Sequence, residues 1–178
     1  MSDGAATDPK LAFPTADGSG LFSGYSPHEH RPLRSYAVMS ATFGSAFVAS
    51  LVAAERSGRE LPEGFSARDI LLTGVATHKL SRLLSKDKAT SFIRAPFTRY
   101  QEPSGQGEVS EEARGSGLRR AIGELVTCPY CLGQWIAAGF VVGLVAAPRP
   151  TRLVAAMYAA ETLSDFLQLA YLAAEERA

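Results

Sequence analysis

The sequence has few cysteines and no excess of either charge. Two of its 178 residues are cysteines, and its 18 Lys and Arg residues are balanced by 18 Asp and Glu residues. Two cysteines are too few for the disulfide framework of a small secreted protein. Without a basic excess the chain has little charge with which to neutralise phosphates, so we expect no nucleic-acid partner.

The N-terminal region has neither a signal-peptide pattern nor an apolar period. Met1-Ser-Asp-Gly is acidic where a signal peptide needs positive charge, and no apolar core follows it. We therefore expect residues 1–35, with their Gly, Ser, Pro, Asp and Thr, to form a disordered tail. His28-Glu29-His30 in this tail contains two metal-ligand types, but histidines in a tail of this kind are more often simply solvated.

Charge is also missing from long blocks of the chain. Residues 36–54 are nineteen residues without a charge, and as a helix they would cover roughly 28 Å, close to the ~30 Å hydrocarbon core of a bilayer. A buried helix of a soluble protein is the alternative, but it would carry a polar stripe. Further helices are expected over about 69–84, 118–147 with a break near 128, and 153–174. The sequence thus predicts an all-α integral membrane bundle over residues 36–176, with about four transmembrane or membrane-embedded helices and a cytoplasmic loop cap.

Local signals place some of the helix ends. Ser66 is expected to cap the second helix, with Asp69 in its first turn. The apolar part of this helix is short, so it either spans the membrane or lies in the interface. Pro129 requires a break in the third helix, with Thr127 as the expected N-cap of the part that follows. Residues 148–152 are expected to form a tight turn.

Four crossings would place both termini in the cytoplasm of a multi-pass protein of the cell membrane. Thirteen of the 18 Lys and Arg residues would then lie inside, and the outer loops would hold only Arg56, Arg59, Arg68, Arg149 and Arg152. The positive-inside rule favours this orientation. Basic residues between 85 and 117 could also meet anionic lipid headgroups, although a topogenic role is the simpler explanation. The lipid bilayer is therefore the first expected partner.

The two cysteines form a Cys128-Pro-Tyr-Cys131 motif at the start of the apolar segment after the break. A thiolate at a helix N-terminus is stabilised by the helix dipole, so Cys128 is the candidate nucleophile and Cys131 the candidate resolving thiol. The same spacing supplies half of a tetrahedral zinc site, but the sequence contains no second pair that would complete it. Thiol exchange, metal binding and chemical inertness all stay open, and no cofactor is identified.

Acidic residues also occur inside the last apolar segment. Glu161 and Asp165 are four residues apart and would share one face of the helix. Acids within a membrane normally face the bundle interior and find partners, and His78 with Arg82 is the expected basic face. These residues suit either a structural clasp between two helices or a proton or ion relay.

Several short blocks occur in a recognisable order. They are His78-Lys-Leu-Ser-Arg82, Lys86-Asp-Lys-Ala-Thr-Ser, Ile93-Arg-Ala-Pro-Phe-Thr, Gly107-Glu-Val and Gly123-Glu-Leu-Val-Thr-Cys-Pro-Tyr-Cys-Leu-Gly-Gln-Trp. In these blocks, from about Ser66 to Ala174, the chain resembles the bacterial membrane-protein family catalogued as domain of unknown function 1360. The resemblance implies a small polytopic membrane protein of unestablished activity, with some sporulation-associated members.

The polar blocks are expected to fold together at the membrane face. Arg94 stands between apolar residues and before a proline, so we expect it to fold back and pair with Glu108 or Glu124. A cytoplasmic cap would then contain His78, Arg82, Arg94, Glu108, Glu124 and the two thiols as a candidate binding site. We expect a structural or interaction role with a protein partner at this face. A membrane-bound thiol-disulfide oxidoreductase or a metal-binding protein is the alternative.

Overall fold

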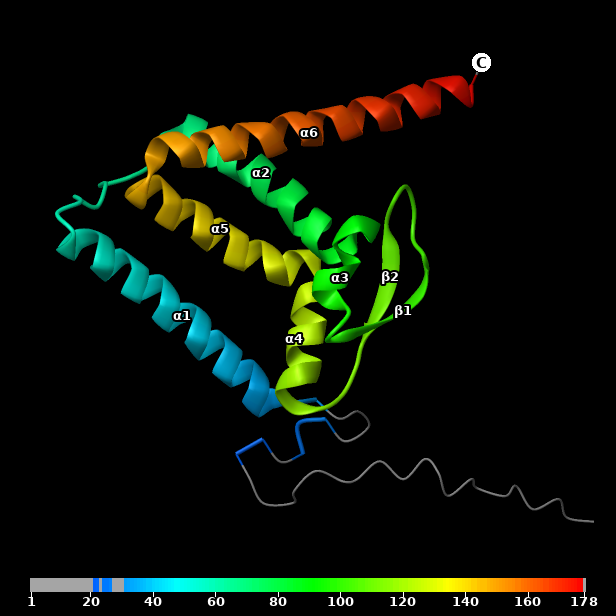
Figure 1. The fold of residues 1–178 in the computed structure, drawn as a ribbon, viewed down its shortest axis with the longest axis horizontal. Coiled ribbons are helices and arrows are strands. Elements are labelled where there is room, and N and C mark those ends of the chain that lie inside the picture. The colour runs from blue at the N-terminus through cyan, green and yellow to red at the C-terminus, as the bar shows by residue number, and fades with distance from the viewer. Residues whose placement is uncertain (1–20, 23, 27–30, 178) are drawn as a thin grey trace, which may run out of the picture.

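The computed structural model describes residues 21–22, 24–26 and 31–177 of the chain. His28-Glu29-His30 and most of the predicted tail lie outside the described residues. The described part is mostly helical, as predicted, with a small two-stranded sheet added (Figure 1). Its elements are α1 (Leu33–Arg56), α2 (Ala67–Lys86), the short 3-10 helix η2 (Lys88–Thr90), α3 (Ser91–Arg94), β1 (Thr98–Pro103), β2 (Val109–Ala113), α4 (Gly117–Thr127), α5 (Pro129–Ala146) and α6 (Pro148–Glu175).

The structure confirms one predicted helix start and differs from the prediction at two others. Ser66 caps α2 as expected, accepting a hydrogen bond from the Asp69 amide at 3.1 Å. The predicted N-cap Thr127 was wrong, because Thr127 ends α4 and Cys128 itself caps α5, with Pro129 in the first turn. The predicted turn at 148–152 was also wrong. α6 already begins at Pro148, since a proline at the first helical position loses no intrahelical hydrogen bond.

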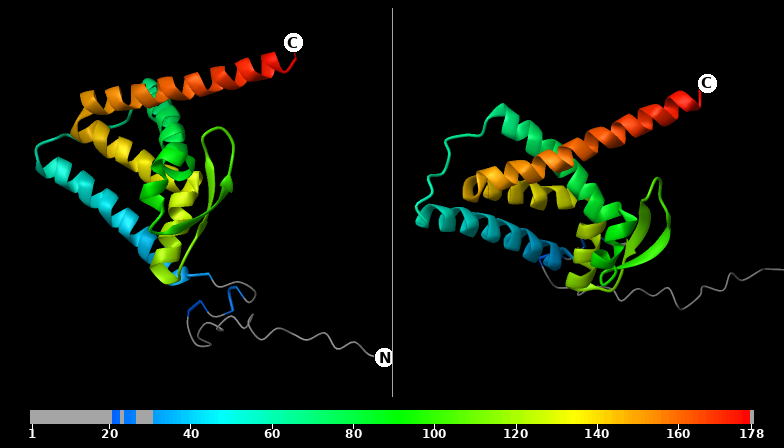
Figure 2. Two further views of the ribbon diagram at one scale, coloured as in Figure 1. Left: turned by 45° about the vertical axis from the view of Figure 1, so that its right-hand side comes forward. Right: turned by 45° about the horizontal axis from the view of Figure 1, so that its top comes forward.

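The helices pack around α2. α2 packs most extensively against α6 and next against α5, and their shared core contains the buried side chains of Ala76, Phe140 and Ala155. α1 lies to one side and contacts α5 through Phe43, whose ring meets Trp135 edge to face at 5.1 Å. The C-terminal half of α6 projects past the other helices (Figures 1 and 2).

The polar region between α3 and α4 contains the small sheet. β1 and β2 pair antiparallel, with Thr98 opposite Ala113 and Pro103 opposite Val109. The connection turns through Gly105 and Gly107, whose φ angles of 101° and 76° favour glycine. We call residues 88–127, from η2 to α4, the hairpin unit. It lies at the ends of the long helices, where α1 begins, α2 ends and α5 begins (Figure 1).

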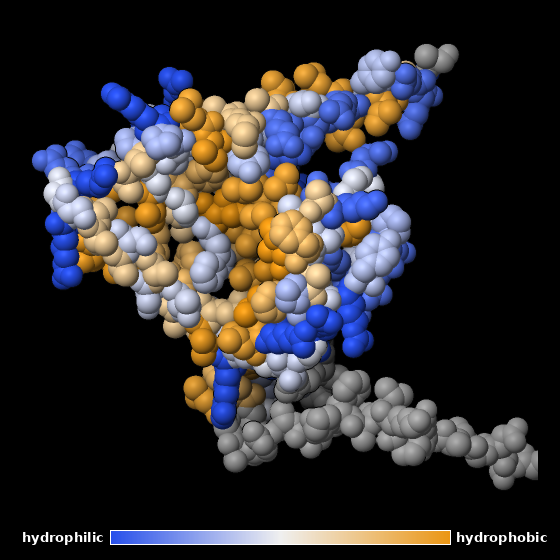
Figure 3. Space-filling view, viewed as in Figure 1, coloured by the Kyte–Doolittle hydropathy of each residue, from blue (hydrophilic) through white to orange (hydrophobic). Residues whose placement is uncertain are grey.

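Two described helices, α1 and α5, are long and apolar enough to cross a membrane by length and composition. Only 6% of the most apolar stretch of α1 and 11% of that of α5 are buried inside the molecule. Apolar residues also cover much of the surface over the long helices, whereas polar residues gather around the hairpin unit (Figure 3). α2 and α6 do not meet the same criterion, so the predicted four-span bundle is not confirmed.

Candidate functional site

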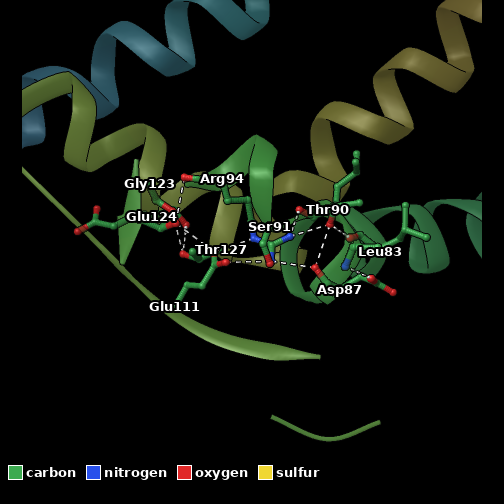
Figure 4. Close-up of polar contacts among 12 residues, drawn as sticks. Leu83, Asp87, Thr90, Ser91, Arg94, Glu111, Gly123, Glu124 and Thr127 are labelled. Carbon is green, nitrogen blue, oxygen red and sulfur yellow. Dashed lines mark hydrogen bonds and ion pairs between the residues drawn. The ribbon is translucent and has the colours of Figure 1, made fainter. Parts of the chain in front are cut away.

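The centre of the hairpin unit is a buried ion pair. The Arg94 side chain is 0% exposed and the Glu111 side chain 5% exposed, with Arg94 Nε 2.7 Å from Glu111 Oε2. A second bond joins Arg94 Nη2 to Glu111 Oε1 at 3.1 Å. The guanidinium therefore binds the carboxylate through two donors (Figure 4). The prediction that Arg94 pairs with Glu108 or Glu124 was therefore wrong.

Arg94 also ties the hairpin unit to the end of α2. Its Nη1 donates to the backbone oxygen of Leu84 at 2.8 Å and to Thr90 Oγ1 at 2.8 Å. Its Nη2 donates to the backbone oxygen of Asp87 at 3.0 Å. A buried charge is tolerated when all its donors are paired, so Arg94 holds the end of α2 and the hairpin unit together.

The other predicted cap residues lie at different places. Arg82 and Glu108 are brought together, with Arg82 Nη2 at 2.6 and 2.7 Å from the two carboxylate oxygens. Glu124 instead accepts a hydrogen bond from Arg120 Nε at 2.9 Å and one from the Tyr36 hydroxyl. His78 stacks on Phe166 of α6 with ring centres 6.4 Å apart. These contacts join α2 to the loop before β2, α4 to α1, and α2 to α6, so the candidate residues form no single cluster.

α4 and the sheet approach each other closely at Gly123. A Cβ atom built there would lie 2.6 Å from the Phe97 backbone oxygen and 2.9 Å from Ala113 Cβ. Contacts this short exclude any side chain, because real Cβ atoms stay farther away. Gly123 therefore allows α4 to lie directly against β2.

The cysteine turn, residues 128–131, lies where the hairpin unit meets α5. Both cysteines are free, with Cys131 exposed and Cys128 half-buried. The Cys131 amide donates to Cys128 Sγ at 3.3 Å, and the Tyr130 side chain between them is 90% exposed. Cys128 is therefore the N-cap of α5, where its sulfur accepts a backbone hydrogen bond.

No metal cage surrounds this turn in the described part of the chain. Over residues 31–177 and the few described before them, no three His, Cys, Asp or Glu side chains lie close enough together to hold a metal ion. The zinc interpretation therefore gains no further ligands from the structure.

Sequence reasoning missed the base that partners the acids of α6. Lys79 Nζ lies 3.2 Å from Glu161 Oε1 and 2.7 Å from Asp165 Oδ2, so the expected partners His78 and Arg82 were wrong. Neighbouring residues on a helix point about 100° apart. A prediction that errs by one residue therefore selects the wrong face.

A second interhelical pair, also missed, closes the far end of the bundle, outside the apolar stretches. Arg152 Nε and Nη2 lie 2.8 and 2.9 Å from the Asp69 carboxylate oxygens. The hydrogen bonds from Arg152 lower the pKa of the Asp69 carboxyl from its usual 3.8 to about 2. The pair fixes the start of α6 to the start of α2.

These features define a small helical protein with two strongly apolar helices and a folded polar unit at their ends. The chain belongs to the family described as "Protein of unknown function (DUF1360)", which matches residues 72–171. The match runs from α2 through the hairpin unit into α6 and leaves out α1.

One curated relative is similar to part of the chain. It is "Sporulation protein YjcA" of Bacillus subtilis (strain 168), 36% identical over 76 residues. That alignment covers 41% of this chain and 64% of the relative, slightly less than two thirds of its length. No solved structure matches the chain.

Proposed function

We propose that this chain is a multi-pass membrane protein in which α1, α2, α5 and α6 cross the bilayer. The hairpin unit would lie on the cytoplasmic face as a rigid platform for a protein partner, giving the protein a structural or interaction role. Ile70 would begin the membrane segment of α2, which leaves Asp69 and Arg152 at the outer surface. Both termini would be cytoplasmic, in line with the excess of Lys and Arg on that side.

The observation that carries this proposal is how little of the apolar helices is covered. A core helix of a soluble protein would be mostly buried. In the most apolar stretches of α1 and α5, only 6% and 11% are buried. Other helices also expose large apolar side chains, with Leu71 at 69%, Leu153 at 74% and Leu167 at 62%. Surface of this extent is unfavourable in water, and a lipid bilayer would cover it.

The charges of α2 and α6 fit this arrangement because they pair with one another. Lys79 contacts both Glu161 and Asp165, which supports the structural clasp. Paired charges facing a neighbouring helix cost less in a bilayer than single ones. The two helices would therefore enter the membrane together.

An interaction role is supported by the build of the hairpin unit. Its polar groups are held by the Arg94–Glu111 pair, while Phe92 and Tyr100 stay 74% and 60% exposed. Exposed aromatic side chains on a rigid polar unit are typical of protein interfaces. The name of the relative suggests sporulation as one process in which to seek the partner.

Single-cysteine labelling tests the topology. Starting from a Cys128→Ser/Cys131→Ser chain, a cysteine is placed at Ser57, between α1 and α2, or at Gln101 in the hairpin unit. In intact cells a membrane-impermeant maleimide should label Ser57→Cys, and it should label Gln101→Cys only after the membrane is opened. Equal labelling of both positions in intact cells, or release of the protein by alkaline carbonate, would contradict the proposal.

A second candidate function, thiol-disulfide exchange, is favoured by the exposed cysteine turn. The Cys128 thiolate would attack a disulfide of a protein substrate, giving a mixed disulfide and releasing one substrate thiolate. Cys131 would then attack the Cys128 sulfur, which leaves a Cys128–Cys131 disulfide and a reduced substrate. The position of Cys128 at the start of α5, with its Sγ beside the Cys131 amide, supports this order.

Alkylation followed by mass spectrometry separates this candidate from inert cysteines. Fast labelling of Cys128 at neutral pH, together with recovery of an intramolecular disulfide, would support exchange. Labelling at the rate of a free cysteine without disulfide formation would rule it out. Protection that a chelator removes would instead indicate a metal.

A further inference from the structure

The Arg114 and Arg119 side chains both donate hydrogen bonds to the backbone oxygen of Pro96. Arg114 Nη2 lies 2.9 Å from the Ala95 backbone oxygen and 3.2 Å from that of Pro96. Arg119 donates to the same Pro96 oxygen through Nε at 3.0 Å and Nη2 at 2.7 Å. The two guanidinium groups therefore lie close together, one from the connection between β2 and α4 and the other from α4.

This pair differs from three other arginines of α2, α3 and α4. Arg82, Arg94 and Arg120 each hold a carboxylate, whereas no carboxylate of the described residues pairs with Arg114 or Arg119. Two guanidinium groups that donate to the same oxygen lie close enough to repel each other, and the neutral carbonyl oxygens do not cancel their charges. The Nε–Nη2 edge of each arginine already donates to backbone oxygens. The Nη1 donors of the two guanidinium groups suit the oxygens of a phosphate group.

The place of the pair in the fold indicates which phosphate it meets. α4 runs from the start of α1 to the start of α5 (Figure 1). At its first turn a Cβ on Gly117 would lie 4.0 Å from Ser35 Oγ of α1, and Cys128 after its last residue caps α5. Where α1 and α5 cross a bilayer, α4 therefore lies along its surface, and Arg119 in the first turn is at headgroup depth.

The surroundings of the pair are apolar as well as cationic. Leu118 beside Arg119 is 49% exposed, and Ala95 and Pro96, whose carbonyls hold the guanidinium groups, are also exposed. Apolar side chains next to basic ones are typical of surfaces that enter the boundary between headgroups and acyl chains. A soluble phosphate ligand would not require this exposed apolar rim.

We propose that Arg114 and Arg119 bind the phosphate of an anionic phospholipid and thereby hold α4 and the hairpin unit against the membrane surface. This inference rests on the proposed membrane function. It adds a lipid class and two binding residues, which a general attraction of basic residues to the membrane does not specify.

The test uses the full chain purified in a neutral detergent and mixed with phosphatidylglycerol or phosphatidylcholine, with bound lipid counted by mass spectrometry of the intact complex. The wild type should bind phosphatidylglycerol more tightly than phosphatidylcholine. Arg114→Gln/Arg119→Gln should weaken phosphatidylglycerol binding roughly thirtyfold, about fivefold for each arginine. The matched control Arg99→Gln, which removes an exposed arginine of β1, should bind as the wild type does.

Three outcomes would overturn the inference. They are equal binding of the two lipids by the wild type, unchanged phosphatidylglycerol binding by the double variant, and displacement of the lipid by equally dilute inorganic phosphate. If the double variant loses its circular dichroism signal, Arg119→Gln alone replaces it, because that side chain is exposed. Alkaline carbonate extraction keeps the two proposals apart. A protein that stays in the membrane without lipid preference refutes only this inference, whereas a protein that is released refutes the membrane function as well.

Discussion

Replacing Arg94 by methionine tests the buried ion pair that centres the hairpin unit. The Arg94 side chain is 0% exposed and that of Glu111 5% exposed, so Arg94→Met leaves a carboxylate buried without its cation. Breaking a buried pair from one side costs about 3–5 kcal/mol. The backbone oxygens of Leu84 and Asp87 also lose a donor, which increases the loss. We therefore expect the hairpin unit to open more easily by at least about 3 kcal/mol.

Trypsin cleavage after Arg99 measures this opening. Arg99 is exposed but lies in β1, where the paired strand must separate from its partner before a protease can bind it. When opening and closing are fast, the cleavage rate follows the population of the open form. A loss of about 3 kcal/mol should then speed cleavage by on the order of a hundredfold.

Two controls identify the cause. Arg94→Met/Glu111→Leu removes both charges and should recover most of the resistance, because no unpaired charge stays buried. Arg82→Gln breaks a pair whose side chains are 45% and 23% exposed, and it should change the opening free energy by less than about 1 kcal/mol. Cleavage of Arg94→Met at the wild-type rate, or a double variant as sensitive as the single one, would refute the reasoning.

Three further predictions concern other contacts. Gly123→Ala should destabilise the hairpin unit by about 1–3 kcal/mol in the same cleavage assay, whereas Gly139→Ala should be neutral, since nothing lies within 4 Å of the added Cβ. Lys79→Met should lower thermal stability in detergent by about 1 kcal/mol, and a matching drop in Lys79→Arg would argue against an ion pair. Because the pKa of Asp69 falls to about 2 in the fold from its usual 3.8, the ionised carboxylate stabilises the fold above pH 3.8, and this contribution is lost as the pH falls through 2. The difference in melting temperature between wild type and Asp69→Asn should therefore stay constant from neutral pH to about pH 4 and shrink below it; a difference that shrinks already near pH 6 would contradict this.

The long helices could be predicted because their signals are local. A run of nineteen residues without charge, a serine before α2 and a proline after Cys128 each act within a few residues of the chain. The helical part of the prediction and the break at 128 needed nothing else. The errors at Thr127 and at Pro148 concern which residue begins a helix, and several neighbouring residues satisfy that condition about equally well.

The hairpin and the ion pairs could not be predicted in the same way. Only Thr98 in β1 and Val109 in β2 are buried, so the strands show almost no apolar alternation. Without a strand assignment, the adjacent glutamates cannot be assigned to opposite faces, although Glu111 points inward to Arg94 and Glu112 is exposed. The partner of Arg94 thus depends on the strand, and the strand leaves little trace in the sequence.

The pairing of charges along α2 supports a place for this helix in the proposed membrane bundle, although α2 alone is less apolar than α1 and α5. Asp69 holds Arg152 at one end, Lys79 holds the acids of α6 in the middle, and Arg82 holds Glu108 near the other end. Alone in a bilayer, α2 would have to bury each of these charges at a free-energy cost. In the fold, each charge has a partner of opposite sign. Neutralised pairs cost much less in a bilayer than isolated charges. The four-crossing proposal therefore depends on α2 and α6 entering the membrane as a pair, whereas α1 and α5 are apolar enough to enter singly.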